Sequence, residues 1–320
     1  MSTRHNSGPA TDDAVKPLVS GTVIPLITAL DSHGRPDAEA VEPLLAYLAE
    51  GGVTSLLVAG TNGEGPLLSG DAVQRYATDV TARWRALVGD AATVMVAATG
   101  PGTEETRRRI EALDDVDLDA VVVLAPFYFK HTERELLAHF QAAAALGRPI
   151  VVYNSPAYTG NPVPVSLIRR LLDEPGIVGL KDNSGDATQF GQFCEVAGER
   201  PGFGVAQGIE RQLDVALRLG ASGTVPGVGM LAPALCVNLF RAGSSGDDAT
   251  ATALQQDVNR LAALFAIRPG ASGVVIMKTA LHLLGLAPAT AAEPFLPCTD
   301  DELAALRTAL DGLSDILRRA

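Results

Sequence analysis

The sequence predicts an α/β fold in which eight parallel strands close into a (β/α)8, or TIM, barrel followed by a C-terminal helical extension. Short runs rich in Val, Ile, Leu and Ala recur along most of the chain, and longer amphipathic segments separate them. The last part of the chain shows helical periodicity alone. We therefore divide the chain into a polar N-terminal tail (1–20), a barrel (21–245) and a C-terminal helical extension (246–320).

Each apolar run has the length and composition of a parallel strand that is buried on both faces. The runs cover residues 22–28, 54–60, 93–98, 119–126, 149–154, 176–181, 203–208 and 222–227. Eight such units in about 220 residues fit a closed barrel better than an open sheet, which stays as the alternative.

The segments between the runs place apolar residues at helical spacing, which predicts a helix after each strand. The first, 37–50, begins with an aspartate that could cap it and ends at a glycine pair. The others are 69–88, 103–115, 132–146, 164–173, 187–198, 209–219 and 230–242, and the extension holds 249–266, 271–285 and 300–318.

Charge and composition exclude several classes of partner. The net charge of -12 argues against nucleic acid and anionic membranes, because phosphate groups require a basic face. The sequence contains no run of about 20 apolar residues, so we expect no membrane-spanning helix. The N-terminus lacks the apolar stretch of a secretion signal. The three cysteines, Cys194, Cys236 and Cys298, are far apart and form no disulfide pattern, which favours the cytoplasm.

Lysine is rare in this chain, with four lysines among 25 basic residues. An amine can form an imine with a carbonyl compound, whereas a guanidinium cannot under physiological conditions. Lys16 lies in the tail, Lys130 follows the fourth strand, and Lys278 lies in a helical segment where we expect a structural or interface role. Lys181 remains, at the end of the sixth strand.

The position of Lys181 predicts a nucleophile, because barrel enzymes place their active sites at the C-terminal ends of the strands. Desolvation there favours the neutral, nucleophilic form of an amine. The structural alternative is an ion pair with Asp182 or Asp186, and position alone does not decide between the two.

Two other strand ends carry candidate site residues. Tyr153 ends the fifth strand, where its hydroxyl could move a proton, although a buried structural tyrosine is the alternative. The second strand ends in AGTNGEG, whose glycines allow a tight turn with backbone N–H groups that converge on an anion, helped by the hydroxyl of Thr61. A glycine-rich segment can also be a turn without a ligand.

Other catalytic chemistries find little support in the sequence. The five histidines show no HExxH motif or other paired spacing, so we expect no metal. The chain also lacks the GxSxG motif of serine hydrolases and the glycine-rich loops that bind phosphates.

Five motifs together resemble the dihydrodipicolinate synthase / N-acetylneuraminate lyase family of pyruvate-dependent class I aldolases. They are GTNGE (60–64), LAPFY (124–128), YNSPAYTG (153–160), GLKDNSGD (179–186) and GASGTVPG (220–227). They occur in the family's order and spacing, and the resemblance covers residues 20–310. It implies a homotetramer built as a dimer of dimers that needs no cofactor, because the lysine imine itself withdraws electrons.

The resemblance also implies roles for particular residues. Lys181 would form an imine with pyruvate or a related 2-oxo acid, and Tyr153 would be the acid/base. Thr61 and Asn62 would hold the carboxylate of that acid. Tyr128, inserted from a neighbouring subunit, would complete a proton relay with Thr61 and Tyr153.

The remaining candidate residues would bind substrate. Val225 would line the pyruvate site through its backbone, and we add Gly208 and Tyr158 as substrate-binding residues. Family members that make the lysine precursor typically read YNxPxRTG, with the arginine on the carboxylate of aspartate semialdehyde. Tyr158 replaces that arginine here, and Asn62 replaces the second threonine of the usual GTTGE.

These departures favour the branch that resembles 4-hydroxy-2-oxoglutarate aldolase. We expect a class I lyase or aldolase that cleaves or forms a carbon–carbon bond, with a hydroxylated 2-oxo acid as substrate. The alternatives are 4-hydroxy-tetrahydrodipicolinate (dihydrodipicolinate) synthase, a sugar-acid dehydratase that uses the same imine, and a non-catalytic relative that binds a small acid.

Overall fold

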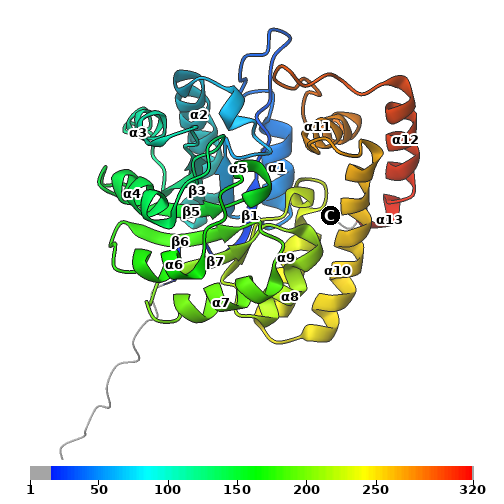
Figure 1. Cartoon of the computed structure of the whole chain (residues 1–320). Coiled ribbons are helices and arrows are strands. Elements are labelled where there is room, and N and C mark those ends of the chain that lie inside the picture. Colours follow the sequence, from blue (N-terminus) through cyan, green and yellow to red (C-terminus); the bar gives the residue numbers. More distant parts are fainter. Residues whose placement is uncertain (1–15, 319–320) are drawn as a thin grey trace, which may run out of the picture.

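The computed structural model describes residues 16–318, so most of the predicted N-terminal tail lies outside the described residues. Eight parallel strands form a closed barrel in sequence order, which confirms the predicted fold class (Figure 1). The strands are β1 (Gly21–Pro25), β2 (Ser55–Val58), β3 (Thr93–Ala97), β4 (Ala120–Leu124), β5 (Ile150–Asn154), β6 (Ile177–Asp182), β7 (Gly204–Gln207) and β8 (Gly223–Thr224).

Alternation along the strands divides the core into two parts. One set of side chains, which includes Val23, Leu57 and Val122, fills the interior of the barrel. The alternate set, which includes Ile24 and Leu56, packs outwards against the helices. Tyr153 belongs to the interior set, so the end of β5 directs this side chain into the barrel mouth.

Helices surround the barrel between successive strands. They are α1 (Glu42–Glu50), α2 (Gly70–Val88), α3 (Thr103–Glu111), α4 (Glu133–Ala144), α5 (Pro156–Thr159), α6 (Val165–Leu171), α7 (Ala187–Ala197), α8 (Leu213–Arg218) and α9 (Pro233–Ser244). Short 3₁₀ turns are η1 (Gly65–Leu67), η2 (Gly89–Ala91), η3 (Glu210–Gln212) and η4 (Gly227–Met230).

The predicted start of the first helix is wrong. The helix begins at Glu42 rather than at Asp37, and Val41 precedes it without a side-chain cap. Asp37 closes a turn instead, because its Oδ1 accepts N–H bonds from Glu39 at 3.0 Å and from Ala40 at 3.1 Å. Pro43 fits this boundary, since proline is tolerated only in the first turn of a helix.

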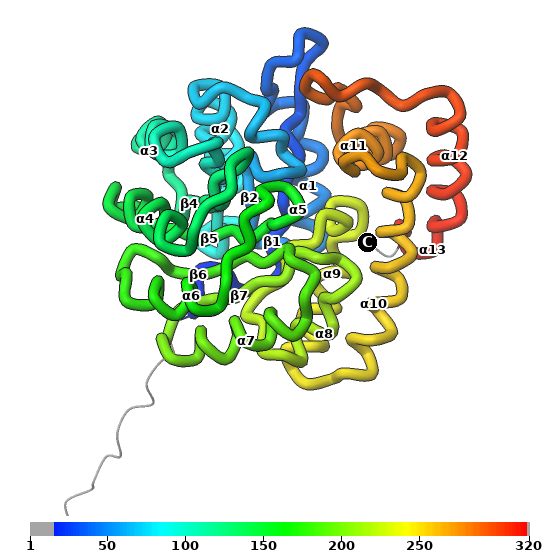
Figure 2. Tube along the Cα trace, viewed as in Figure 1, coloured from blue at the N-terminus to red at the C-terminus, as the bar shows by residue number. Residues whose placement is uncertain are grey.

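The C-terminal part of the chain adds α10 (Asp248–Ala262), η5 (Ala263–Ile267), α11 (Val274–Leu283), α12 (Asp300–Asp311) and α13 (Ser314–Leu317). These helices lie along one side of the barrel, and α10 packs against α9 (Figures 1 and 2). The division at residue 245 remains a prediction. None of the helices between residues 16 and 318 combines the length and apolar character that a membrane crossing requires.

Candidate active site

Lys181 and Tyr153 lie side by side at the ends of β6 and β5, because the strand register pairs them directly. The Nζ atom of Lys181 lies 4.2 Å from the centre of the Tyr153 ring, and the lysine is 5% exposed. Among the described residues, no carboxylate lies within 4.0 Å of Nζ, so the ion-pair alternative is wrong. Asp186 instead caps α7 by accepting the N–H of Gln189 at 3.0 Å.

Asp182 points away from the barrel interior and closes a buried network behind the two candidate catalytic residues. Its Oδ1 accepts from Asn154 Nδ2 at 2.6 Å, and its Oδ2 accepts from Ser184 Oγ at 2.8 Å. The Oδ1 of Asn154 accepts the N–H of Val163 at 2.9 Å. Burial raises the pKa of Asp182, and the hydrogen bonds from Ser184 and Asn154 oppose that shift. The network ties together the ends of β5 and β6.

The turn after β2 brings Thr61 to Tyr153, with 3.3 Å between their hydroxyl oxygens. Ala59 and Glu64 adopt left-handed backbone conformations, with φ of 54° and 56°. A Cβ on Gly65 would lie 1.9 Å from the carbonyl oxygen of Ala59, so only glycine fits there. The motif therefore folds into a compact, strained turn beside the candidate acid/base.

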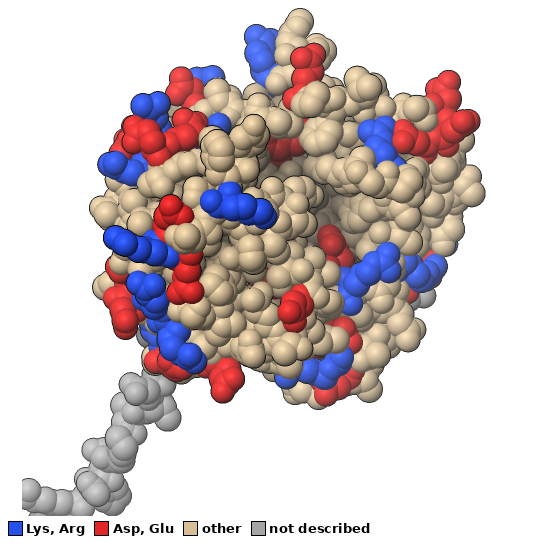
Figure 3. Space-filling model, viewed as in Figure 1, with Lys and Arg blue, Asp and Glu red and all other residues tan. Residues whose placement is uncertain are grey.

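These strand ends and loops enclose a cavity of about 210 Å³. Seven of the predicted site residues line it together: Thr61, Asn62, Tyr153, Tyr158, Lys181, Gly208 and Val225. The cavity opens on the face of the molecule where α5 and α11 lie (Figure 1). In Figure 3 this face shows a hollow that is surrounded mainly by uncharged residues. Sequence reasoning thus located the residues of one cavity, while their chemical roles remain proposals.

Sequence reasoning did not name seven residues that line this cavity, among them Pro25 at the end of β1 and Gly227 after β8. Asn183 and Glu210 follow the ends of β6 and β7, so the strand-end rule could have found them. Phe265, Ser272 and Gly273 come from the C-terminal helical extension, and no motif marks them. The extension therefore builds one wall of the site.

Asn183 and Glu210 present polar groups to the cavity. The Oδ1 of Asn183 is buried and has no hydrogen-bond partner among the described residues. A Cβ on Gly208 would lie 2.2 Å from that oxygen, so the glycine makes room for it. Glu210 accepts the N–H of Gly227 at 3.1 Å. Burial raises the pKa of Glu210, and the nearby Lys181 charge partly opposes the shift.

Tyr158 lies at the outer edge of the cavity, where it is 58% exposed. Partial burial raises the pKa of its hydroxyl, and a hydrogen bond with Ser272 of the extension opposes that shift. A second, mainly apolar cavity of about 240 Å³ adjoins here and shares Thr61, Tyr158 and Ser272 with the first. Leu67, Leu124, Phe127 and Phe295 contribute its apolar lining.

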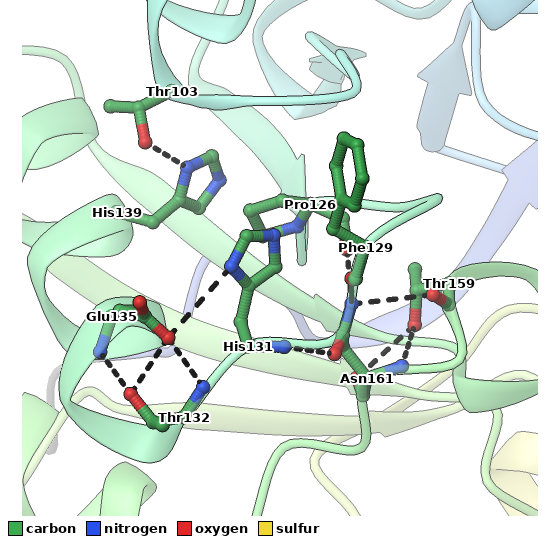
Figure 4. Close-up of polar contacts among 9 residues, drawn as sticks. All are labelled: Thr103, Pro126, Phe129, His131, Thr132, Glu135, His139, Thr159 and Asn161. Atoms are coloured by element: carbon green, nitrogen blue, oxygen red, sulfur yellow. Dashed lines mark hydrogen bonds and ion pairs between the residues drawn. The ribbon is translucent and has the colours of Figure 1, made fainter.

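Tyr128 is the predicted site residue that does not line the cavity of its own chain. It is 86% exposed and has a left-handed backbone (φ 82°). The side chain of Asn161 holds its loop: Nδ2 donates to the carbonyls of Pro126 at 2.8 Å and Phe129 at 2.7 Å, and Oδ1 accepts from His131 N at 2.9 Å (Figure 4). The proposed insertion of Tyr128 into a neighbouring subunit remains a prediction.

The described residues do not form a cluster of protein metal ligands. Between residues 16 and 318, no three His, Cys, Asp or Glu side chains come close enough together to bind one ion. His139, for example, is buried between Thr103 Oγ1 at 3.0 Å from Nδ1 and the carbonyl of Leu124 at 3.2 Å from Nε2.

Solved structures share this architecture over nearly the whole chain. YagE, a prophage protein of the dihydrodipicolinic acid synthase family from Escherichia coli K12 that was crystallised with pyruvate, is 26% identical, with a TM-score of 0.85 over 92% of this chain and 98% of YagE. A monomeric dihydrodipicolinate synthase variant matches equally well, with 26% identity and a TM-score of 0.85 over 93% of this chain and 97% of its own. The fold is thus the closed (β/α)8 barrel with C-terminal helices that solved dihydrodipicolinate synthase structures also have.

Sequence relatives identify the family. Residues 18–313 match the profile of the Dihydrodipicolinate synthetase family. An "Uncharacterized DapA-like lyase" of Halobacterium salinarum is 31% identical over 97% of this chain and 98% of the relative. A 4-hydroxy-tetrahydrodipicolinate synthase of Corynebacterium aurimucosum is 31% identical over 90% and 92%, and the "Putative 2-dehydro-3-deoxy-D-gluconate aldolase YagE" is 28% identical over 92% and 97%. The chain belongs to the Dihydrodipicolinate synthetase family and is a lyase.

Proposed function

We propose that this lyase makes or breaks a carbon–carbon bond through an imine between Lys181 and pyruvate or a related 2-oxo acid. The observation that carries the proposal is the buried Nζ of Lys181, which has no carboxylate partner and lies 4.2 Å from the Tyr153 ring at the cavity floor. An amine freed from ion pairing and shielded from water is suited to attack a carbonyl carbon.

The proposed reaction begins when the Lys181 nitrogen adds to C2 of the 2-oxo acid. The resulting carbinolamine loses water and becomes a protonated imine. In cleavage, the electron pair of the C3–C4 bond moves toward the iminium nitrogen, C4 leaves as an aldehyde, and the enamine takes a proton at C3 before water releases pyruvate. Condensation reverses these steps. No metal or organic cofactor takes part, because the iminium accepts the electrons.

Tyr153 is the proposed acid/base for these steps. Its hydroxyl protonates the departing oxygen of the carbinolamine and takes the proton from the C4 hydroxyl during cleavage. The 3.3 Å contact with Thr61 gives the proton a second oxygen to move to. Thr61 and Asn62 would hold the carboxylate of the 2-oxo acid, with the backbone of Val225 and the space beside Gly208 completing the pyruvate site.

The charge of the cavity favours an uncharged, hydroxylated second substrate. Among the described residues that line it, Lys181 is the single cation and Glu210 the single carboxylate. A hydroxylated aldehyde can donate to Glu210 and to the unpaired Oδ1 of Asn183. Aspartate semialdehyde carries a carboxylate, and in this cavity Tyr158 stands where an arginine would bind that carboxylate. A single hydroxyl binds a carboxylate less well than a guanidinium does.

Within the family we therefore place this chain with aldolases that act on hydroxylated 2-oxo acids. The sugar-acid aldolase name that YagE carries supports this choice, and the motifs favour the 4-hydroxy-2-oxoglutarate aldolase-like branch. Dihydrodipicolinate synthase activity is the competing candidate, because several relatives bear that name. A dehydratase that uses the same imine and a non-catalytic acid-binding protein are further outcomes to test.

We also propose that the enzyme works as a homotetramer in which Tyr128 completes the site of a neighbouring subunit. The exposed Tyr128 and the apolar cavity beside Thr61 support this arrangement. In a single chain both surfaces are open to solvent, and a second copy could cover them.

A substrate panel tests the proposed function. The enzyme is incubated with 4-hydroxy-2-oxoglutarate, with 2-keto-3-deoxygluconate, and with pyruvate plus aspartate semialdehyde, and pyruvate release or consumption is followed. We expect turnover of a hydroxylated 2-oxo acid and little of aspartate semialdehyde. Strong turnover of aspartate semialdehyde would contradict the specificity, and loss of water without release of pyruvate would assign the enzyme as a dehydratase.

A further inference from the structure

A buried ion pair links the turn after β2 to the C-terminal helical extension. Nζ of Lys278, on α11, contacts Oε1 of Glu64, the last residue of the GTNGE motif. Both side chains are fully shielded from solvent. The two residues are far apart in the sequence, so this contact exists only in the folded chain.

Each charge of the pair also holds the backbone that follows α11. Nζ of Lys278 donates to the carbonyl of Thr290 at 2.7 Å, and Oε2 of Glu64 accepts the N–H of Ala292 at 2.5 Å. Burial lowers the pKa of Lys278, and the charge of Glu64 opposes that shift. Because burying two charges is costly, hydrogen bonds of this kind are what make such a pair tolerable.

The turn needs an external support, because its own backbone is strained. Glu64 has a left-handed conformation that a residue with a side chain rarely adopts unless its surroundings impose it. The hydroxyl of Thr28, in the segment after β1, donates to the carbonyl of Gly63 at 2.6 Å, and Arg109 Nη1, on α3, donates to the carbonyl of Gly65 at 3.1 Å. The Glu64–Lys278 pair supplies the third support, from the extension.

The segment that leads into the same helix lines the cavity. Ser272 and Gly273 immediately precede α11 and line the cavity together with Thr61 and Asn62. Lys278 lies within the same helix, so a shift of the turn relative to α11 would change both walls of the cavity at once.

We propose that the Glu64–Lys278 pair is a positioning device that holds the turn, residues 60–65, where Thr61 and Asn62 meet the carboxylate of the 2-oxo acid. This inference rests on the proposed function. Breaking the pair should weaken capture of the 2-oxo acid most, and slow the later steps less, because Lys181 and Tyr153 lie on strands and only Thr61, the second oxygen on the proton's path, lies on the turn.

The test is Lys278→Met, which keeps the length of the side chain and removes its charge. The pyruvate concentration for half-maximal borohydride trapping, and the KM of the substrate that the panel identifies, should rise about 10- to 100-fold. The rate at saturation should fall by a smaller factor than the half-saturation concentration rises, since Lys181 and Tyr153 keep their places on the strands. A half-saturation within twofold of wild type in folded Lys278→Met overturns the proposal.

Arg268→Met is the matched control. Arg268 pairs with Glu302 at 2.6 Å within the extension and has no hydrogen bond to the turn. It should lower thermal stability without changing the half-saturation for pyruvate. An equal rise in both variants would show a general effect of a loosened extension and overturn the proposal.

A double variant keeps the test decisive if Lys278→Met does not fold. Glu64→Gln with Lys278→Met leaves no unpaired buried charge and retains an oxygen for the N–H of Ala292. This double variant should fold and should still need a higher pyruvate concentration for half-maximal trapping than wild type. A pyruvate concentration equal to that of wild type overturns the proposal. If wild type itself is not trapped by pyruvate, the proposed function fails instead, so the two failures are distinguishable.

Discussion

The two sides of the cavity are held in different ways. On one side, the regular register of β5 and β6 places Tyr153 and Lys181 next to each other, and the buried Asn154–Asp182 contact ties the strand ends together. On the other side, the turn after β2 has irregular backbone and depends on contacts with distant segments, including Lys278.

This difference separates the chemistry from the binding. The proposed nucleophile and acid/base lie on rigid strands, where hydrogen bonds between neighbours define their positions. The groups proposed to bind the carboxylate lie on a loop whose shape is imposed from outside. Changes on the strand side should therefore mainly reduce the rate, and changes on the turn side, apart from the loss of the Thr61 hydroxyl, should mainly reduce affinity for the 2-oxo acid.

The largest effects are expected on the strand side. Lys181→Ala should abolish pyruvate trapping and turnover, because no other described lysine lines the cavity. Tyr153→Phe should lower turnover by about 10²–10⁴-fold while imine still forms, since general acid–base groups contribute on that order. Steady-state kinetics combined with trapping would measure both, and a Tyr153→Phe enzyme that turns over like wild type would remove this residue from the mechanism.

A substitution in the turn should change binding first. In Gly65→Ala the new Cβ would lie 1.9 Å from the carbonyl oxygen of Ala59, so the turn must shift. We expect a higher KM for the 2-oxo acid and a loss of about 1–3 kcal/mol in unfolding free energy. Gly70→Ala is the control, because nothing lies within 4 Å of a Cβ there. Similar kinetics for the two variants would contradict the account of the turn.

Tyr158 tests how the second substrate is chosen. Tyr158→Arg restores the carboxylate-binding residue of the family motif, and it should raise kcat/KM for aspartate semialdehyde by about 10- to 100-fold, the range expected for charge-assisted hydrogen bonds. Tyr158→Phe, which removes the hydroxyl alone, should give no such gain. If Tyr158→Arg leaves the preference unchanged, the specificity lies elsewhere in the cavity.

The last prediction concerns stability rather than catalysis. Burial lowers the pKa of His139 from 6.5 to about 4 in the folded protein. The unfolded chain takes up the His139 proton below pH 6.5, whereas the folded protein takes it up only near pH 4. The free energy of unfolding that this group contributes is therefore fully present above pH 6.5 and is lost as the pH falls to about 4. The loss from this group should be about 2–3 kcal/mol. Urea unfolding at pH 7 and pH 4.5 should show a smaller pH dependence for His139→Gln, and an equal dependence would contradict the assignment.

Local patterns in the sequence predicted the barrel and much of the cavity. Buried parallel strands appear as continuous apolar runs, so the eight strands were found where they occur. Lys181 and Tyr153 followed from the rule that strand ends meet at one edge of the barrel. The first helix was predicted to begin too early, because Asp37 looks like a cap in the sequence although it closes a separate turn.

Contacts between distant segments escaped prediction. Nothing in the local pattern around Lys278 indicates that its partner is Glu64, and Ser272 reaches the cavity only because α11 packs beside the barrel mouth. The periodicity of a helix defines which face is buried, but not which distant group it meets. The sequence also left open whether Lys181 forms an ion pair, a question that depends on where the carboxylates of Asp182 and Asp186 point.

The most direct measurement of the central claim is mass spectrometry of peptides after pyruvate and borohydride treatment of the whole enzyme. Reduction converts an imine with pyruvate into a stable secondary amine, which adds a fixed mass to one lysine. We predict that the added mass lies on the peptide that contains Lys181, and that the peptides of Lys130 and Lys278 remain unmodified. Absence of the adduct from Lys181 would contradict the imine mechanism, whatever the fold.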